Sequence, residues 1–268
     1  MFKKVLNKIN DLIGLVYDFL YNKYIYSKEN IILREEKKII KEFKISRKDS
    51  LIILNKVLEK THGREFDEKN DSGHWLLSAA ISQSININRI LEIGTYTGEF
   101  TAILSKLFLD SEIITIDLPE NDPILRNSYN RDNNDLYDDF KKEQNKNIDK
   151  SGNVNLLLTN SLFLNDKVNG KFDLIWVDGG HNYPEIAWDL CNSYNLLNDG
   201  GILMCDDIIK MEKDFAKRFV STDSYRVLDY LNQRVNNSVL YFLKRLDGKR
   251  YARLKNRKYI ALLKNNNF

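Results

Sequence analysis

The chain has 268 residues, 43% of them hydrophobic, which is enough to form a large core without disulfides or structural metals. Its 12 glycines and 3 prolines exclude collagen-like and proline- or glycine-rich disordered classes. The 41 Lys and Arg residues against 38 Asp and Glu residues leave a net charge of +3, too balanced to indicate a general nucleic-acid-binding protein. Two cysteines, Cys191 and Cys205, indicate no disulfide framework and fit the reducing cytosol, so we expect a cytoplasmic protein.

Apolar residues at helical spacing mark the N-terminus: Phe2, Val5, Ile9, Leu12, Ile13, Val16 and Leu20. No small-residue cleavage site follows, and polar residues interrupt every stretch of about 18 apolar residues, so neither a signal peptide nor a spanning helix is predicted. We expect this helix to dock on its own domain or on a second subunit. Lysines flank the apolar stripe, and weak contact of residues 1–25 with a membrane surface is the alternative.

Charged helical sequence continues from Ile31 to Lys60, and the polar stretch Thr61–Ser72 then breaks the pattern. We therefore divide the chain into an N-terminal helical extension, residues 1–71, and a main domain, residues 72–268. The extension is expected to form a lid, part of an acceptor pocket or a dimer contact.

Strands and helices alternate in the main domain. Short apolar runs predict strands at Arg89–Gly94, Glu112–Asp117, Val154–Thr159, Phe172–Asp178 and Gly201–Asp206. Helices are predicted at Trp75–Ser82, Phe100–Phe108, Leu136–Ile148, Pro184–Leu197 and Met211–Val220. Apolar strands separated by helices are typical of a parallel sheet covered on both faces, so the predicted fold is a doubly wound, Rossmann-like α/β domain.

The pattern weakens after Thr222. Tyr225–Leu231 and Lys258–Leu263 are predicted as strands, and Val239–Leu246 fits either a helix or a strand. The basic segment Arg245–Lys258 is interpreted as a solvated face.

The stretch Leu91–Gly98 (LEIGTYTG) predicts a nucleotide site. A strand leads into a glycine turn that opens a helix, which directs backbone N–H groups toward a ligand. Asp117 ends the next strand, where a carboxylate can accept both hydroxyls of a ribose. The turn lacks the G-x-G-x-x-G pattern of dinucleotide sites, because Glu92 replaces the first glycine.

Acidic residues follow the fourth and fifth strands, at Asp178 and at Asp206–Asp207. If these strands are neighbours, about 4.8 Å apart, the three carboxylates converge. They would repel one another and hold protons unless a cation lay among them, for which Mg²⁺ is suited and Mn²⁺ or Ca²⁺ are alternatives. Without a metal, Asp206 or Asp207 would cap a helix beginning near Ile208, and Asp178 would only hydrogen-bond an amino group of the ligand at the predicted nucleotide site. His181 is one of only 3 histidines and lies in the loop after Asp178, which makes it a candidate site residue; an ordinary surface or core histidine is the alternative.

These motifs resemble class I S-adenosylmethionine-dependent methyltransferases over roughly residues 72–264. The first motif of that family is an acid followed by x-G-x-x-x-G, matched here by Glu92, Gly94 and Gly98. The resemblance implies a seven-stranded sheet with a final antiparallel strand. It also implies cofactor-binding residues: Glu92, Gly94, Thr95, Gly98, Asp117, Leu118, Asn160, Ser161 and Asp178. For Asn160, a helix N-cap is an equally good interpretation.

The pattern Asp-Gly-x-His-x-Tyr, with Gly-Gly leading to Asp-Asp, resembles the metal-dependent O-methyltransferases that act on sugar hydroxyls in macrolide tailoring. That resemblance implies Asp178, Asp206 and Asp207 as magnesium ligands and His181 as the general base. The first acid of the last pair is commonly Glu in those enzymes, whereas here it is Asp206.

The predicted function is therefore methyl transfer from S-adenosylmethionine to a hydroxyl of a small molecule, such as a free or nucleotide-linked sugar. Alternatives are an RNA or DNA methyltransferase, a catechol-type O-methyltransferase and a non-enzymatic scaffold. The Asn/Asp-Pro-Pro-aromatic motif of nucleic-acid N-methyltransferases is absent after the fourth strand, where Asp178 is followed by Gly-Gly-His.

Overall fold

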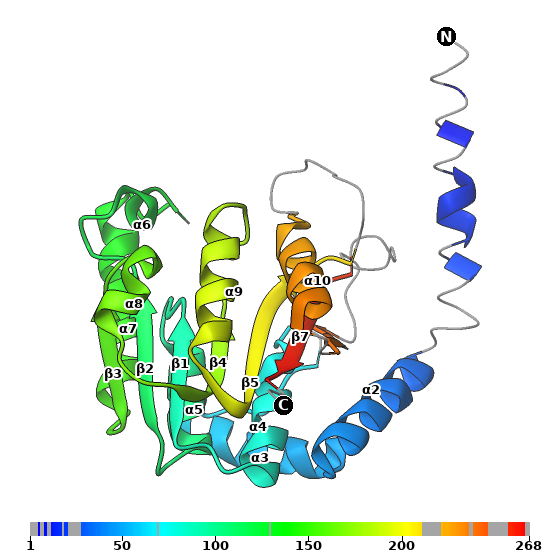
Figure 1. Cartoon of the computed structure of the whole chain (residues 1–268), viewed down its shortest axis with the longest axis horizontal. Coiled ribbons are helices and arrows are strands. Elements are labelled where there is room, and N and C mark those ends of the chain that lie inside the picture. The colour runs from blue at the N-terminus through cyan, green and yellow to red at the C-terminus, as the bar shows by residue number, and fades with distance from the viewer. Residues whose placement is uncertain are drawn as a thin grey trace.

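The computed structural model of the chain describes residues 28–68, 70–128, 130–210, 221–235, 238–245 and 257–265, together with positions 5, 8, 9, 12–17, 19 and 20. The strands are β1 (Arg89–Ile93), β2 (Glu112–Asp117), β3 (Val154–Leu158), β4 (Phe172–Val177), β5 (Leu197–Ile208), β6 (Leu240–Leu243) and β7 (Tyr259–Lys264). They form one seven-stranded sheet in the order β3-β2-β1-β4-β5-β7-β6 (Figure 1). β1 to β5 are parallel, and β7 runs antiparallel to β5 and to β6. The doubly wound α/β prediction is confirmed.

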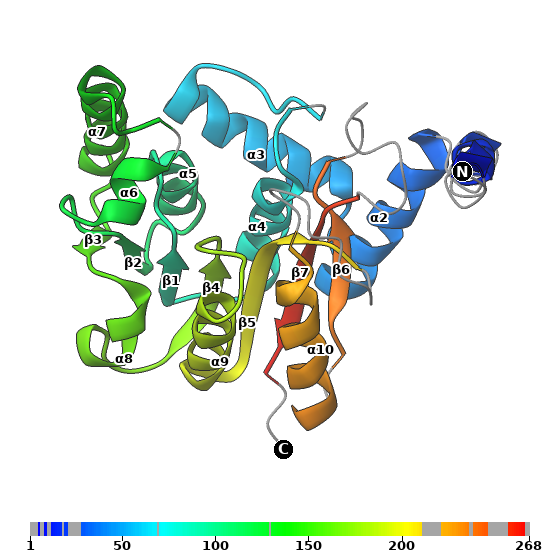
Figure 2. The same cartoon turned by 90° about the horizontal axis from the view of Figure 1, so that it is seen from above.

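The N-terminal helices are α2 (Lys28–Phe43), α3 (Arg47–His62) and α4 (Gly73–Ser84). Those between strands are α5 (Glu99–Leu107), α6 (Pro123–Asn127), α7 (Asn134–Asp149), α8 (Leu164–Lys167) and α9 (Glu185–Asn195), and α10 (Asp223–Val235) precedes β6; Ser161–Phe163 forms a 3-10 turn. Figure 2 shows α3, α4 and α5 on one face of the sheet and α8, α9 and α10 on the other.

Strand side chains alternate between two cores, as expected for a sheet covered on both faces. Ile90, Leu174 and Trp176 face the core built with α3, α4 and α5. Their neighbours Leu91 and Ile175 face the second core, to which α9 and α10 contribute. This arrangement explains why the strands are almost continuously apolar in sequence.

The predicted strand at Tyr225–Leu231 is wrong, because this segment lies within helix α10. Ser224, Leu228 and Leu231 are its buried residues, at the spacing of four and three that a helix requires. The adjacent tyrosines and valine favoured a strand by propensity, which tertiary packing overrides. Of the two interpretations of Val239–Leu246, the strand is confirmed by β6. The predicted helix at Met211–Val220 lies outside the described residues.

Helix α2 covers the exposed edge of the sheet. The Glu35 carboxylate accepts a hydrogen bond from the backbone N–H of Leu243 at 3.0 Å, and Lys38 donates to the carbonyl of Tyr241 at 2.7 Å. β6 is the edge strand, and these bonds satisfy backbone groups that would otherwise invite pairing with another chain. The extension from residue 28 onward is therefore packed into the same body as the sheet. Among the described residues, no helix has the length and apolar character needed to cross a bilayer.

Candidate functional site

The turn after β1 brings three strand ends together. Gly94 has a φ of 100°, and a Cβ at this position would lie 2.3 Å from the carbonyl oxygen of Asp178. Only glycine allows the turn to pass this close to the end of β4. The N–H of Gly94 also donates to the carbonyl of Ile116 in β2 at 2.9 Å. The turn thus lies at the carboxyl ends of neighbouring parallel strands, where such sheets bind ligands.

Helix α7 fixes the glycine loop from outside. Gln144 donates its side-chain N–H to the carbonyl of Tyr96 at 2.7 Å, and Asn147 donates to the carbonyl of Thr97 at 2.8 Å. Both amide side chains are buried. Neither residue was predicted from the sequence, because polar residues three apart in a charged helix are typical of a solvated face. They hold the loop backbone in one conformation.

The predicted cofactor residues Glu92 and Thr95 direct their side chains into the protein. The Glu92 carboxylate accepts hydrogen bonds from the hydroxyls of Thr101 at 2.5 Å and Thr115 at 2.6 Å. The Thr95 hydroxyl bonds that of Thr115 at 2.5 Å. Burial raises the pKa of Glu92 to about 8, although both hydroxyls oppose the shift. These side chains brace the loop from beneath.

Asp117 joins the glycine loop to the end of β2. Its carboxylate accepts hydrogen bonds from the backbone N–H groups of Tyr96 at 2.9 Å and of Leu118 at 2.8 Å. Burial raises the pKa of this carboxyl, and the two N–H groups oppose that shift. The carboxylate is held beside the loop at the position expected for a ribose-binding acid, and ribose binding stays a prediction.

Asn160 and Ser161 follow β3. The Asn160 side-chain oxygen accepts the N–H of Leu162 at 2.9 Å, which confirms its interpretation as an N-cap, here of the 3-10 turn. The Ser161 carbonyl accepts a hydrogen bond from the Trp188 indole of α9 at 3.2 Å. The predicted contact of Asn160 with an adenine stays a prediction, for which its amide N–H₂ group is the available donor.

Asp178 and His181 form a pair in the loop after β4. Nε2 of His181 lies 3.3 Å from Oδ1 of Asp178. Burial lowers the pKa of His181, but the hydrogen bond and charge of Asp178 more than offset this effect and raise it above 6.5. The other ring nitrogen, Nδ1, is buried and has no hydrogen-bond partner among the described residues. A histidine whose one nitrogen is held by a carboxylate while the other is unpaired can act as a general base.

A β-bulge places Asp206 and Asp207 on the same cation. Cys205 and Ile208 pair with Ala261 and Tyr259 of β7, so two β5 residues oppose a single residue of β7. Asp207 has a φ of 55°. Without the bulge, consecutive strand side chains would point to opposite faces. The alternative in which these acids cap a helix near Ile208 is wrong, because Ile208 is a strand residue.

The cation is Lys244, which follows β6. Its ammonium lies 2.6 Å from Oδ1 of Asp207 and forms a second, shorter ion pair with Oδ2 of Asp206. Lys258 pairs with the other oxygen of Asp207. Burial alone would raise the pKa of Asp207, but the two lysines hold it well below its usual range. The sequence predicted Lys258 as part of a solvated basic segment, and Lys244 was not predicted as a site residue.

The predicted magnesium ligands do not fit a metal as they are arranged. Within the described ranges, no three His, Cys, Asp or Glu side chains are grouped so that they could hold a metal ion. Three of the four oxygens of Asp206 and Asp207 are already ion-paired to lysines. A dication placed among them would be repelled by two ammonium groups.

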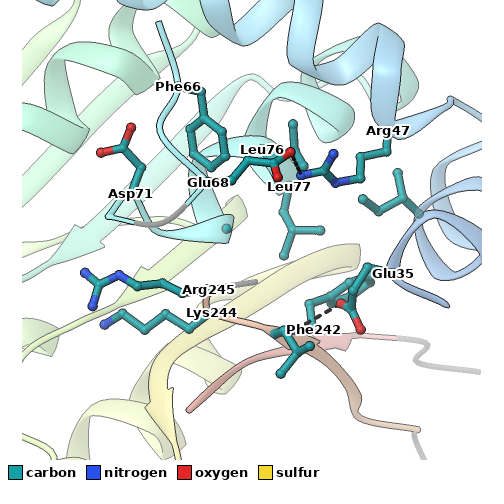
Figure 3. Close-up of a pocket in the computed structure, with 13 residues that line it drawn as sticks. Glu35, Arg47, Phe66, Glu68, Asp71, Leu76, Leu77, Phe242, Lys244 and Arg245 are labelled. Carbon is teal, nitrogen blue, oxygen red and sulfur yellow. Dashed lines mark hydrogen bonds and ion pairs between the residues drawn. The ribbon is translucent and has the colours of Figure 1, made fainter. Parts of the chain in front are cut away.

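A small pocket, to whose lining Lys244 contributes, lies between the N-terminal helices and the end of β6 (Figure 3). Glu35, Phe66, Asp71 and Arg245 are among its lining residues, and Lys244 and Arg245 extend side by side in the view. Its volume of about 30 Å³ is far below the roughly 300–1,000 Å³ of a typical small-molecule site. We therefore place the candidate site on the β1, β2, β4 and β5 ends instead.

Residues 91–208, from β1 to the bulge of β5, match a family model described as a methyltransferase domain. The match covers the strand ends and loops that form the candidate site. A search of curated proteins found no match.

Solved structures share the fold at low identity. One is a candidate O-methyltransferase from Klebsiella pneumoniae, with 15% identity and a TM-score of 0.51 over 87% of this chain and 96% of that one. Another is a candidate caffeoyl-CoA O-methyltransferase from Staphylococcus aureus, with 15% identity and a TM-score of 0.50 over 87% and 99% of the two chains. These likenesses confirm the methyltransferase fold.

Proposed function

We propose that this protein transfers a methyl group from S-adenosylmethionine to a hydroxyl of a small molecule, with a sugar as the expected acceptor and His181 as the general base. The observation that carries the proposal is the Asp178–His181 pair beside the Gly94 turn. The O-methyltransferases that share the fold support a hydroxyl acceptor.

The residues around the glycine loop fit this cofactor. When bound, S-adenosylmethionine supplies an electrophilic methyl group on a positively charged sulfur. The Asp117 carboxylate, fixed by two backbone N–H groups, would hold the ribose hydroxyls. The close approach at Gly94 leaves the loop backbone open to the ligand.

His181 and Asp178 would divide the work of proton removal. Asp178 accepts the N–H at Nε2 and so keeps the lone pair on Nδ1. A hydroxyl oriented at Nδ1 would give this buried nitrogen its missing partner and pass it a proton as the oxygen attacks. The imidazolium that forms would be stabilised by the Asp178 charge. The remaining contribution of the chain is alignment of the hydroxyl with the methyl group.

Cofactor binding is the first test, and it needs no acceptor. A ligand that binds only the folded state stabilises it by mass action, so S-adenosylmethionine and its demethylated product should raise Tm, and NAD should not. Asp117→Ala should weaken binding by about 1–3 kcal/mol, the cost of losing charge-assisted hydrogen bonds. Asp110→Ala removes an exposed acid elsewhere and is the control. A wild-type Tm that does not respond to millimolar S-adenosylmethionine would refute the proposal.

A further inference from the structure

Two lysines, one directly after β6 and one directly before β7, form ion pairs with the two acids at the end of β5. Three ion pairs join two carboxylates and two ammonium groups, those of Asp206, Asp207, Lys244 and Lys258. Only 3% of the Asp206 side chain and 13% of the Lys244 side chain are exposed. A buried carboxylate of this kind requires a fixed partner, and Lys244 supplies it.

The backbone of Lys244 is held on both sides, so its position does not depend on the acids alone. Its N–H donates to the carbonyl of Lys258 at 3.1 Å, and its carbonyl accepts the N–H of Gly73, the first residue of α4, at 2.7 Å. A Cβ on Gly73 would lie 2.8 Å from the carbonyl of Leu243, so glycine is required for this contact. The backbone contacts with α4 and with the residue before β7 together hold the Lys244 ammonium beside the bulge.

We propose that Lys244 is the resident cation at the end of β5, in the place where the predicted metal-dependent site would hold a divalent ion. Lys244 is a positioning residue, since it fixes Asp206 and Asp207 beside Asp178. The consequence for catalysis, that methyl transfer does not require a divalent metal, rests on the proposed function. The assignment of the cation itself does not, because it can be tested without turnover.

The test uses the full chain and Mn²⁺ alone, after treatment with a chelator and its removal. Binding is followed by electron paramagnetic resonance and by titration calorimetry. Wild type should show no site with a Kd below about 1 mM. Stoichiometric Mn²⁺ binding by wild type that Asp207→Asn abolishes would overturn the proposal.

Lys244→Met removes the ammonium, keeps most of the side-chain length and should bind Mn²⁺ at least tenfold more tightly than wild type. Lys264→Met is the matched control, because Lys264 lies at the other end of β7 and pairs with Glu42 of α2. Equal Mn²⁺ affinity in Lys244→Met and Lys264→Met would count against the proposal.

Lysine labelling covers the case in which Lys244→Met does not fold. Reductive methylation of wild type should leave Lys244 unmodified, and 5 mM Mn²⁺ should not change this. A rise in Lys244 labelling with Mn²⁺ would mean that the metal displaces the ammonium, and the proposal would fail.

The two proposals fail in different ways. Loss of the S-adenosylmethionine-induced rise in Tm with no Mn²⁺ binding would refute the proposed function and leave Lys244 as the cation. A normal rise in Tm, together with turnover that a chelator abolishes and Mn²⁺ restores, would refute the inference alone.

Discussion

Glu92 makes the stability of the protein depend on pH. Its buried carboxyl has a pKa of about 8 in the folded state against 4.5 as the ordinary value. Between these values the folded chain keeps a proton that the unfolded chain has lost, so the free energy of unfolding falls as pH rises. The slope is at most about 1.4 kcal/mol per pH unit.

Glu92→Gln should remove this contribution, because the amide does not titrate. Between pH 5 and pH 7, wild type should lose up to about 3 kcal/mol more unfolding free energy than the variant, measured by urea denaturation. Glu112→Gln at the start of β2 is the control, since 55% of the Glu112 side chain is exposed. Parallel pH curves for wild type and Glu92→Gln would contradict the prediction.

His181 should affect turnover without affecting cofactor binding. His181→Ala should lower kcat by about 10²- to 10⁴-fold, the usual contribution of a positioned base, while the S-adenosylmethionine-induced rise in Tm stays near wild type. Only the neutral ring accepts a proton, and Asp178 holds the pKa above 6.5. Wild-type kcat should therefore rise with pH through a midpoint above 6.5, and the variant should lose this limb. An unchanged profile would show that His181 is not the base.

At the scale of elements, the contact between the start of α4 and the end of β6 holds the backbone of Lys244 in place. Gly73→Val would press its side chain against the Leu243 carbonyl, 2.8 Å from the Cβ position, and should destabilise the fold by about 1–3 kcal/mol. Gly152→Val is the control, because nothing lies within 4 Å of the Cβ position of Gly152. Chemical denaturation measures both. An equal loss of unfolding free energy in Gly73→Val and Gly152→Val would mean that the close contact between α4 and β6 does not account for the destabilisation.

The parallel strands and the lysine pairs at the end of β5 differ in how far the sequence could predict them. The parallel strands were predictable, because apolar runs such as that of β2 are bounded by polar turns. The bulge at Asp206–Asp207 was not, since it depends on the register against β7, about 55 residues further along the chain. Lys244 lies beside the acids because β6 pairs with β7, and β7 in turn pairs with β5. The sequence shows only that acids follow two strands, and these acids predicted a metal site. The long-range pairing of β6 and β7 instead brings lysines to the acids of β5.

For the molecule as a whole, the first helical stretch and α2 differ in their relation to the sheet. The described apolar residues before α2 are exposed, with Leu12 at 62% and Phe19 at 65%. In α2, by contrast, Ile39 and Phe43 are buried in the core that they share with α3 and α4. The two stretches should therefore contribute very differently to stability, although both have apolar residues at helical spacing.

Truncation tests this difference. Removal of residues 1–27 should change Tm by less than about 2 °C and preserve the S-adenosylmethionine-induced rise, because little apolar surface of the described residues in this stretch is buried on the domain. Removal of residues 1–45 should lower Tm by more than about 10 °C, since it opens the β6 edge and empties the sites of Ile39 and Phe43, each worth about 2–5 kcal/mol. Differential scanning fluorimetry at several protein concentrations measures both. A large loss on removing residues 1–27 would contradict the prediction, and its dependence on concentration would tell docking on a second subunit from docking on the same chain.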